Sequence, residues 1–386
     1  MRISSRILPI TVTAVAMATA AFPAMATDLK VGFISSLSGP IAALGIPYEK
    51  GIRVAASLYT TVAGHKVQLI VMDDASDPST AARNARKLVS EDKVDVLIGT
   101  SGVPGAMAIA AVARETRTPL ISPTPVSLPG EQGLWTVTVS QPFPLMVTAV
   151  VERMKRSGVK TVAFIGFSDA LGDLAYDSLV KAAEPAGIKI VANERYARSD
   201  ASVVGQVLKI VATRPDAVFA GNSGTPGALP YLALAERGYR GGLYGTHGLI
   251  NPDFVRVGGG AVEGLSVPSG PVMVADQLAL DNPIRRVATV FRSAYQRQYQ
   301  ALPNDAFAAY AFDAWLVFAD AAARVKGKSE PGTSQFRAAL YEALTQTHEL
   351  VGTHGIYNFK PGERYGLDER SRVIIKLEKG QWKLAP

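Results

Sequence analysis

The chain has no cysteine among its 386 residues. Without cysteine it can form neither disulfides nor a thiolate metal site, and a lipidated cysteine after a signal peptide is excluded as well. Histidine is scarce, and the four histidines lie far apart without metal-ligand spacing, at positions 65, 247, 348 and 354. The sequence therefore predicts no metal and no cofactor.

Concentrated charge of one sign is also absent. The formal net charge is +7, yet no run of five or more basic residues occurs. Basic residues are scattered, as at Arg83, Arg86 and Lys87, and scattered charge is typical of solvated helix faces rather than of a nucleic-acid surface. We expect no nucleic-acid partner.

Complete catalytic motifs are missing too. Gly166-Phe167-Ser168-Asp169-Ala170 lacks the last glycine of the G-x-S-x-G nucleophile elbow. There is no Gly-Lys-Ser/Thr phosphate loop, and Gly258-Gly259-Gly260 lacks the spacing of a dinucleotide-binding turn. Asp73-Asp74 is better explained as a turn before the helix that starts near Pro78 than as a metal site. The sequence indicates a protein that is not an enzyme, and a secreted α/β hydrolase using Ser168 is the alternative.

Long apolar runs are confined to the N-terminus. Arg2 and Arg6 precede an apolar run from Ile7 to Phe22, and Ala24-Met25-Ala26 has the small-x-small pattern of a cleavage site. These features predict a signal peptide over residues 1–26, cleaved after Ala26. A membrane anchor is the alternative, but the run is short for a spanning helix. We expect a periplasmic mature chain without membrane insertion.

The remaining chain alternates short apolar runs with stretches of helical periodicity. The first series of predicted strands is Leu29–Ile34, Val67–Met72, Val94–Ile98 and Pro119–Ile121. The second is Thr161–Gly166, Ile188–Ala192, Ala217–Ala220, Leu243–Tyr244 and Gly264–Val267. Continuous apolar runs are typical of strands buried on both faces, so an α/β fold with parallel sheets flanked by helices is predicted.

Three proline- or glycine-rich segments divide the two series. They are Gln141–Pro144, Pro268–Pro271 and Gly352–Gly355. Helices are expected near 282–300, 304–326 and 333–346, and terminal strands near 372–377 and 381–384. We predict an N-terminal lobe of residues 27–141 plus 272–352 and a C-terminal lobe of 142–271 plus 353–386. Several crossings would let the lobes hinge as stiff bodies.

An internal repeat is the most informative feature of the chain. Ser101-Gly102-Val103-Pro104-Gly105-Ala106 recurs as Ser223-Gly224-Thr225-Pro226-Gly227-Ala228, and each copy follows a buried strand and leads into a predicted helix. Ligands of open α/β sheets bind at the carboxyl ends of strands, where helix N-termini favour anions. The repeat predicts a cleft between two lobes with an anion site on at least one wall.

The candidate ligand-binding residues follow strands in this pattern. From the first lobe they are Leu37, Ser38, Thr100, Ser101, Gly102, Val103, Ser122, Thr124, Pro125 and Val126, and from the second Leu171, Ser223, Gly224, Thr225 and His247. His247 either contacts the ligand or caps the helix that begins near Pro252. Tyr48 and Phe143 could reach the cleft, but aromatic residues at such positions are more often packing.

Several short motifs, in order and spacing, carry a family resemblance over nearly the whole mature chain. They are Leu29–Phe33 with Leu37–Pro40, Asp73-Asp74 with Asp77-Pro78, Ile98–Ser101, Ile121–Pro123 and Gly355–Phe359. They resemble type I periplasmic binding proteins of the branched-chain amino acid transporter group. The resemblance implies two Rossmann-like lobes joined by three crossover strands and a ligand delivered to an inner-membrane ABC permease. A monomer is expected, and a sensor subunit of the same fold is an alternative.

The resemblance also bears on the ligand. Amino acid binders of this family hold the α-carboxylate with hydroxyls at positions that match Val103 and Val126 here, so Ser101 and Thr124 would have to replace them. A frequent tyrosine corresponds to Leu171, and an acidic partner of the ligand's ammonium group corresponds to His247. An unpaired buried ammonium group is costly. The sequence therefore favours an aromatic carboxylate, with a branched-chain amino acid or amide as the alternative.

Overall fold

The structure is a computed structural model that describes residues 27–360 and 362–385. The predicted signal peptide, residues 1–26, lies outside the described residues. Within this part of the chain, every helix is too short or too polar to cross a membrane.

The first sheet is built from the N-terminal part of the chain. Its strand order is β2 (Thr61–Val62), β3 (His65–Asp73), β1 (Leu29–Ser35), β4 (Val96–Gly99), β5 (Leu120–Ser122) and β6 (Thr136–Thr138). All neighbouring strands are parallel except the β2–β3 pair. Phe33 of β1 lies opposite Ile98 of β4, and both are fully buried, as the continuous apolar runs predicted.

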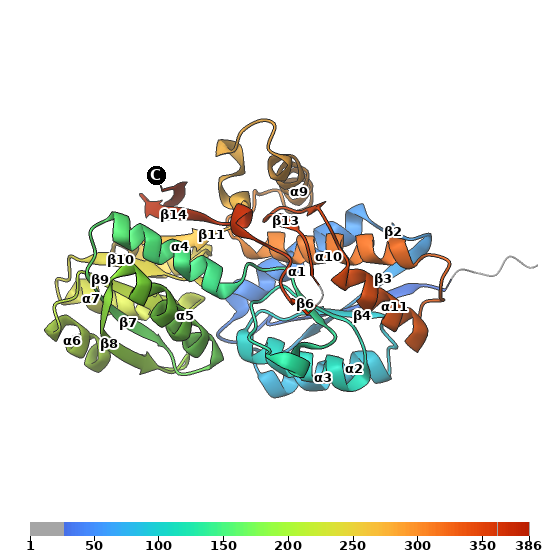
Figure 1. The fold of residues 1–386 in the computed structure, drawn as a ribbon, viewed down its shortest axis with the longest axis horizontal. Coiled ribbons are helices and arrows are strands. Elements are labelled where there is room, and N and C mark those ends of the chain that lie inside the picture. Colours follow the sequence, from blue (N-terminus) through green and yellow to red (C-terminus); the bar gives the residue numbers. More distant parts are fainter. Residues whose placement is uncertain (1–26, 361, 386) are drawn as a thin grey trace, which may run out of the picture.

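Helices cover both faces of this sheet (Figure 1). They are α1 (Ala42–Leu58), α2 (Pro78–Ser90), α3 (Val103–Thr116), α9 (Pro283–Tyr299), α10 (Phe307–Val325) and α11 (Ser334–Thr345). The α2 and α3 helices pack side by side on one face, and α1 packs against α10 on the other. Asp77 caps α2 by accepting a hydrogen bond from the Thr80 N–H, so the Asp73–Pro78 segment forms the turn that the sequence indicated.

The second sheet contains seven strands. Their order is β15 (Gln381–Leu384), β14 (Val373–Glu378), β11 (Ser266–Ser269), β10 (Gly242–Gly245), β9 (Ala217–Gly221), β7 (Thr161–Phe167) and β8 (Lys189–Tyr196). The β14 and β15 strands are antiparallel to their neighbours, and the other five strands are parallel. The accompanying helices are α4 (Phe143–Arg156), α5 (Ala170–Ala186), α6 (Val204–Ala212), α7 (Leu229–Glu236) and α8 (Pro252–Gly258).

The five parallel strands follow the same order in both sheets. In chain order this is second, first, third, fourth, fifth: β3-β1-β4-β5-β6 and β8-β7-β9-β10-β11. The two copies of the sequence repeat follow β4 and β9, the third strand of each set. In such sheets the ligand binds beside the first and third strands, where the direction of winding reverses. We call the first sheet with its helices the first lobe, and the second sheet with its helices the second lobe.

The copies differ in their local structure. Val103 begins α3 directly, whereas the second copy first forms a 3-10 turn, and α7 starts only at Leu229. That turn is η2 (Thr225–Ala228), and the other 3-10 turns of the described residues are η1 (Gly130–Gly133), η3 (His247–Leu249), η4 (Gly259–Val262), η5 (Pro271–Gln277) and η6 (Glu369–Ser371).

The third crossing is longer than the sequence indicated. A short hairpin of β12 (Leu350–Val351) and β13 (Ile356–Tyr357) is followed by a bridge between Tyr365 and Thr138 at the edge of the first sheet. Only β14 and β15 then return to the second sheet (Figure 1). The lobe boundaries stay a prediction. We propose that the third boundary, where the chain returns to the second lobe, lies near Leu367 rather than between residues 352 and 353.

Candidate ligand-binding site

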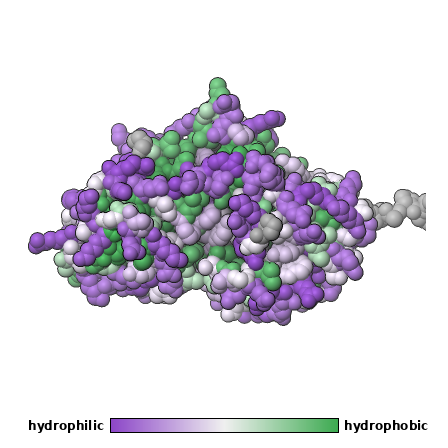
Figure 2. Space-filling view, in the orientation of Figure 1, coloured by the Kyte–Doolittle hydropathy of each residue, from purple (hydrophilic) through white to green (hydrophobic). Residues whose placement is uncertain are grey.

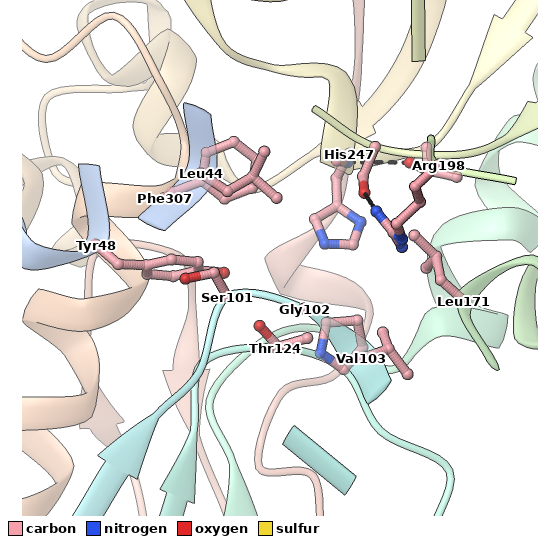
Figure 3. A pocket seen from close by; sticks show the side chains of 14 residues that line it. Leu44, Tyr48, Ser101, Gly102, Val103, Thr124, Leu171, Arg198, His247 and Phe307 are labelled. Atoms are coloured by element: carbon pink, nitrogen blue, oxygen red, sulfur yellow. Dashed lines mark hydrogen bonds between the residues drawn. The ribbon is translucent and has the colours of Figure 1, made fainter. Parts of the chain in front are cut away.

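A small cavity lies between the two lobes. It is bordered by the carboxyl ends of strands from both sheets, and a notch separates the lobes in the space-filling view (Figure 2). The lining residues are Leu44, Tyr48, Ser101, Gly102, Val103, Thr124, Pro125, Leu171, Arg198, Ser223, Thr246, His247, Gly248 and Phe307 (Figure 3).

The wall from the first lobe is mostly apolar. Leu44 and Tyr48 project from α1 and Phe307 from the start of α10, and the Tyr48 and Phe307 ring centroids are 5.5 Å apart. Ser101 precedes α3 and Thr124 follows β5, and both are at least 95% buried. This wall can pack against a hydrocarbon or aromatic body.

The wall from the second lobe carries the charge, at Arg198 just after β8. The Arg198 Nε donates to Asp169 Oδ2 at 2.6 Å, and Nη1 donates to Ser223 Oγ at 3.2 Å. The guanidinium carbon lies 4.0 Å above the centre of the Phe167 ring. The remaining nitrogen, Nη2, is buried and has no hydrogen-bond partner. Asp169, Ser223 and Phe167 therefore hold this side chain, and its Nη2 can still donate to another group.

His247 begins the short turn after β10 and is 5% exposed. Its ring faces the rings of Phe143 and Tyr310 edge-on, at centroid distances of 5.9 and 6.2 Å. Burial lowers the pKa of His247 to about 4, because the charged form loses its hydration. The imidazole is therefore neutral near pH 7, and its Nδ1 has no hydrogen-bond partner.

The helix near Pro252 does not need His247. Asn251 caps it, since its Oδ1 accepts from the Phe254 N–H at 2.9 Å. The structure therefore does not support the capping role of His247, which instead lines the cavity, and its contact with a ligand stays a prediction.

No lining residue of the cavity is a carboxylate. The aspartate beside it, Asp169, is paired with Arg198 and also accepts from the Leu171 N–H at the start of α5. The free polar atoms of the cavity are therefore donors or neutral groups, an arrangement that favours an anionic ligand group.

The structure brings together eight of the fifteen residues predicted for the site. They are Ser101, Gly102, Val103, Thr124, Pro125, Leu171, Ser223 and His247. Ser101 and Ser223, the first residues of the two repeat copies, lie on opposite walls of this one cavity.

The other seven lie outside the cavity lining: Leu37, Ser38, Thr100, Ser122, Val126, Gly224 and Thr225. The Leu37 N–H and the Ser38 hydroxyl both donate to Asp73, at 2.9 and 2.7 Å, at the surface. The Thr100 hydroxyl donates to Asp74. Leu37 and Ser38 thus belong to a surface turn that Asp73 holds, and Thr100 is bonded to the neighbouring Asp74.

The remaining four are held by local structure. The Ser122 hydroxyl donates to the Thr124 carbonyl at 2.7 Å, and Val126 is clamped by the Tyr365 hydroxyl through both its N–H and its carbonyl. Gly224 has φ of +66°, and its N–H donates to the Gly248 carbonyl, after β10, at 2.9 Å. Thr225 begins the η2 turn. These four residues are thus held by local contacts and do not line the cavity.

Six lining residues were not among the predicted site residues: Leu44, Tyr48, Arg198, Thr246, Gly248 and Phe307. Thr246 and Gly248 flank His247, and Arg198 lies just beyond the carboxyl end of a predicted strand, so the rule that found the others applies to them as well. Leu44 and Phe307 carry no such signal, because they look like ordinary core positions of helices.

The hydrolase alternative finds no support at Ser168. Its hydroxyl donates to the Tyr196 carbonyl at 3.2 Å, and Ser168 does not line the cavity. Over the residues that the structure describes, no group of three His, Cys, Asp or Glu could hold a metal ion.

A cavity between two similar α/β lobes, lined by packing and hydrogen-bonding groups, is typical of a ligand-binding protein. Residues 28–362 match the family model described as "Periplasmic binding protein", and the chain belongs to this family. It is therefore a solute-binding protein and not an enzyme, and the resemblance deduced from its motifs is confirmed. Proteins of this family bind small ligands and work with ABC permeases.

Several relatives are similar over almost the whole chain. A Leu/Ile/Val-binding protein, BraC3 of Rhizobium johnstonii, is 26% identical over 96% of this chain and 98% of its own length. The structure of an extracellular ligand-binding receptor from Rhodopseudomonas palustris is 39% identical, with a TM-score of 0.91 over 94% of this chain and all of that one.

A third relative shares the fold at low identity. The branched-chain amino acid transporter substrate-binding protein LivJ from Streptococcus pneumoniae, in complex with isoleucine, is 19% identical. Its TM-score is 0.77 over 92% of this chain and 98% of that one. Together with the family match, it confirms the predicted fold of two Rossmann-like lobes.

Proposed function

We propose that this chain is the substrate-binding subunit of an ABC importer that delivers a small apolar carboxylate to an inner-membrane permease. The observation that carries the proposal is the Arg198 Nη2, buried at an otherwise uncharged cavity without a partner. A buried donor without a partner is rare and costly, and a charged donor more so. A ligand carboxylate would supply the missing acceptor.

Branched-chain amino acids are the first ligands to consider. The relatives named above include a Leu/Ile/Val-binding protein and a transporter subunit in complex with isoleucine. The apolar groups of Leu44, Val103 and Leu171 line the cavity and could pack against an aliphatic side chain.

An aromatic carboxylate is the second candidate, and one observation favours it. The cavity wall has no carboxylate to pair with an ammonium group, and His247 is neutral near pH 7. The Tyr48 and Phe307 rings could stack against an aromatic ligand. An acid without an ammonium group avoids the cost of an unpaired buried charge.

A thermal-shift screen separates these candidates. The panel is L-leucine, L-isoleucine and L-valine against benzoate and 3-phenylpropanoate, with L-leucinamide and benzamide as controls that lack the carboxylate. A ligand at about one hundred times its Kd should raise the free energy of unfolding by about 2.7 kcal/mol, seen as a higher Tm. A shift from the amino acids alone selects the first candidate and one from the aromatic acids alone the second. If no acid in the panel shifts Tm, the proposed function is wrong.

We also infer a periplasmic location for the mature chain. Support comes from the family and from the predicted signal peptide ending at Ala26. A monomer and a permease partner, rather than a sensor partner, remain parts of this proposal. Sedimentation of the mature protein and ligand uptake by a strain lacking the gene would test them.

A further inference from the structure

We infer that the ligand's acid group is bound by the second lobe, through Arg198, Ser223 and His247, while the first lobe contacts its apolar body. This inference rests on the proposed function, because it assumes an acidic ligand. It reverses the sequence-based expectation that Ser101 and Thr124 on the first lobe hold the carboxylate. A carboxylate only accepts hydrogen bonds, and each hydroxyl has one proton to donate. A hydroxyl that already donates within the protein is therefore not free to donate to the ligand.

The proton of Ser101 is already used within the first lobe. The Ser101 and Ser35 hydroxyls are 2.8 Å apart, and either could donate to the other. The Ser35 hydroxyl, however, donates to the Gly45 carbonyl at 2.9 Å. The proton between the two serines must therefore come from Ser101, whose oxygen also accepts from the Ser36 N–H at 3.1 Å.

The other hydroxyls of this wall are also committed. Thr124 donates to the Thr100 carbonyl at 2.5 Å, and Tyr48 donates to the Pro123 carbonyl at 3.2 Å. The first turn of α3 contains Pro104, which has no N–H. Apart from backbone N–H groups, the first lobe has no free donor for an acid at the cavity.

The second lobe has unpartnered polar groups on three segments that line the cavity, and His247 donates in the tautomer with its proton on Nδ1. Arg198 Nη2 follows β8 and has no partner. Ser223 follows β9, and its oxygen accepts from Arg198 while its own proton has no acceptor among the described residues. His247 follows β10, and its Nδ1 is without a partner. Figure 3 shows Arg198 and His247 across the cavity from Tyr48.

The charged donor is also fixed in place. Asp169 holds the Arg198 Nε, and Asp169 itself accepts from the N–H groups of Leu171 and Gly172 at the start of α5. The Phe167 ring supports the face of the guanidinium. A side chain that is held before the ligand arrives loses little conformational freedom on binding.

Ligand recognition is thereby divided between the lobes. The second lobe binds the acid group, and Leu44, Tyr48 and Phe307 of the first lobe contact the apolar body of the ligand. Substitutions on the first lobe would then change which acid binds, whereas substitution of Arg198 would change whether an acid is preferred at all.

Titration calorimetry tests this division of roles between the lobes by comparing the affinity for an acid with the affinity for its amide. The pairs are L-leucine with L-leucinamide and 3-phenylpropanoate with 3-phenylpropanamide, measured on the wild type and on Arg198→Gln. We expect the acid that binds the wild type to bind Arg198→Gln at least tenfold more weakly. Its preference over the matching amide should fall close to one.

Two further variants control for folding and charge. The double variant Asp169→Asn/Arg198→Gln leaves no unpaired buried carboxylate and should show the same loss of preference. Arg195→Gln removes a nearby arginine that pairs with Asp173 and stacks on Phe164 but does not line the cavity, so it should keep the wild-type preference. The Tm of each variant confirms that it is folded.

The outcomes separate this inference from the proposed function. If no acid binds the wild type, the proposed function fails and the inference fails with it. If an acid binds the wild type and both Arg198 variants with the same preference over its amide, the inference alone is overturned. A loss of preference in Ser101→Ala but not in Arg198→Gln would place the acid on the first lobe and would equally overturn it.

Discussion

At the scale of single residues, the charged groups of Asp313 and Arg198 differ in how fully they are paired within the protein. Asp313 is fully buried in α10, but its carboxylate accepts from the N–H groups of Thr353 and His354 and from the Tyr357 hydroxyl. Arg198 keeps one nitrogen unpaired beside the cavity. Buried polar groups normally find partners within the protein, so an unpaired one at a cavity wall indicates a ligand.

A pH-dependence follows from the burial of His247. Its folded-state pKa of about 4 lies below its ordinary value of 6.5, so between these values the unfolded chain binds more protons and the free energy of unfolding rises with pH. Lowering the pH from about 7.5 to about 5 should therefore cost the wild type about 2 kcal/mol through this residue.

The variant His247→Asn should lack this contribution. Urea unfolding of both proteins at the two pH values, without ligand, measures the difference directly. Contributions of groups that do not interact with His247, such as the buried Asp305, are common to both proteins and cancel. An equal pH-dependence in both proteins would show that His247 is not held neutral by burial.

Sequence reasoning found most of the site residues near the ends of predicted strands, but it missed Arg198 after β8 and the residues that α1 and α10 contribute. Ser101, Ser223 and His247 were reached through the repeat and the carboxyl-end rule. Phe307 comes from α10, and nothing in its local pattern separates it from core residues of that helix. Which face of α10 meets the cavity depends on how the chain returns to the first lobe, a tertiary fact that periodicity does not contain.

At the scale of elements, the strands with long apolar runs and the last three helices were predicted to within a few residues. Four short strands were missed, β2, β6, β12 and β13. The β6 strand has only three residues, Thr136–Thr138, and follows Trp135 with φ of +69°. The β2 strand has only two residues. Such short segments have too few alternating or apolar positions to show a period, and pairing in the sheet decides their structure.

Close packing between α1 and α10 gives a prediction about glycine. A Cβ at Gly51 of α1 would lie 1.8 Å from the carbonyl oxygen of Ala308 in α10, so the helices touch backbone to backbone there. Gly51→Ala must push α10 away and should lower the free energy of unfolding by about 2–3 kcal/mol.

Gly205 in α6 provides the matched control. A Cβ at Gly205 meets nothing within 4 Å, so Gly205→Ala should raise the free energy of unfolding by about 0.5 kcal/mol, as expected for alanine in an exposed helix. Denaturant unfolding of both variants measures the two effects. Equal effects of the two substitutions would contradict the close contact between α1 and α10.

At the scale of the whole molecule, polar and aromatic groups connect the lobes close to the cavity. Tyr310 of α10 donates to Gln141 at the first crossing, and Gln141 donates to the Ser371 carbonyl beyond the third. The Tyr310 ring stacks on His354 at 3.5 Å and meets the edge of His247 at the cavity. Movement of the lobes would therefore have to rearrange groups that contact the ligand site, so ligand binding and the relative position of the lobes are coupled.

The most direct test of the central claim, that a small acid binds between the lobes with its charge on Arg198, is a crystal structure with the acid that raises Tm most. We predict the ligand in the cavity that Ser101 and His247 share, with a carboxylate oxygen about 3 Å from an Arg198 nitrogen. A ligand bound outside this cavity, or one whose acid group lies against the N-terminus of α3 while Arg198 contacts only protein, would contradict the account.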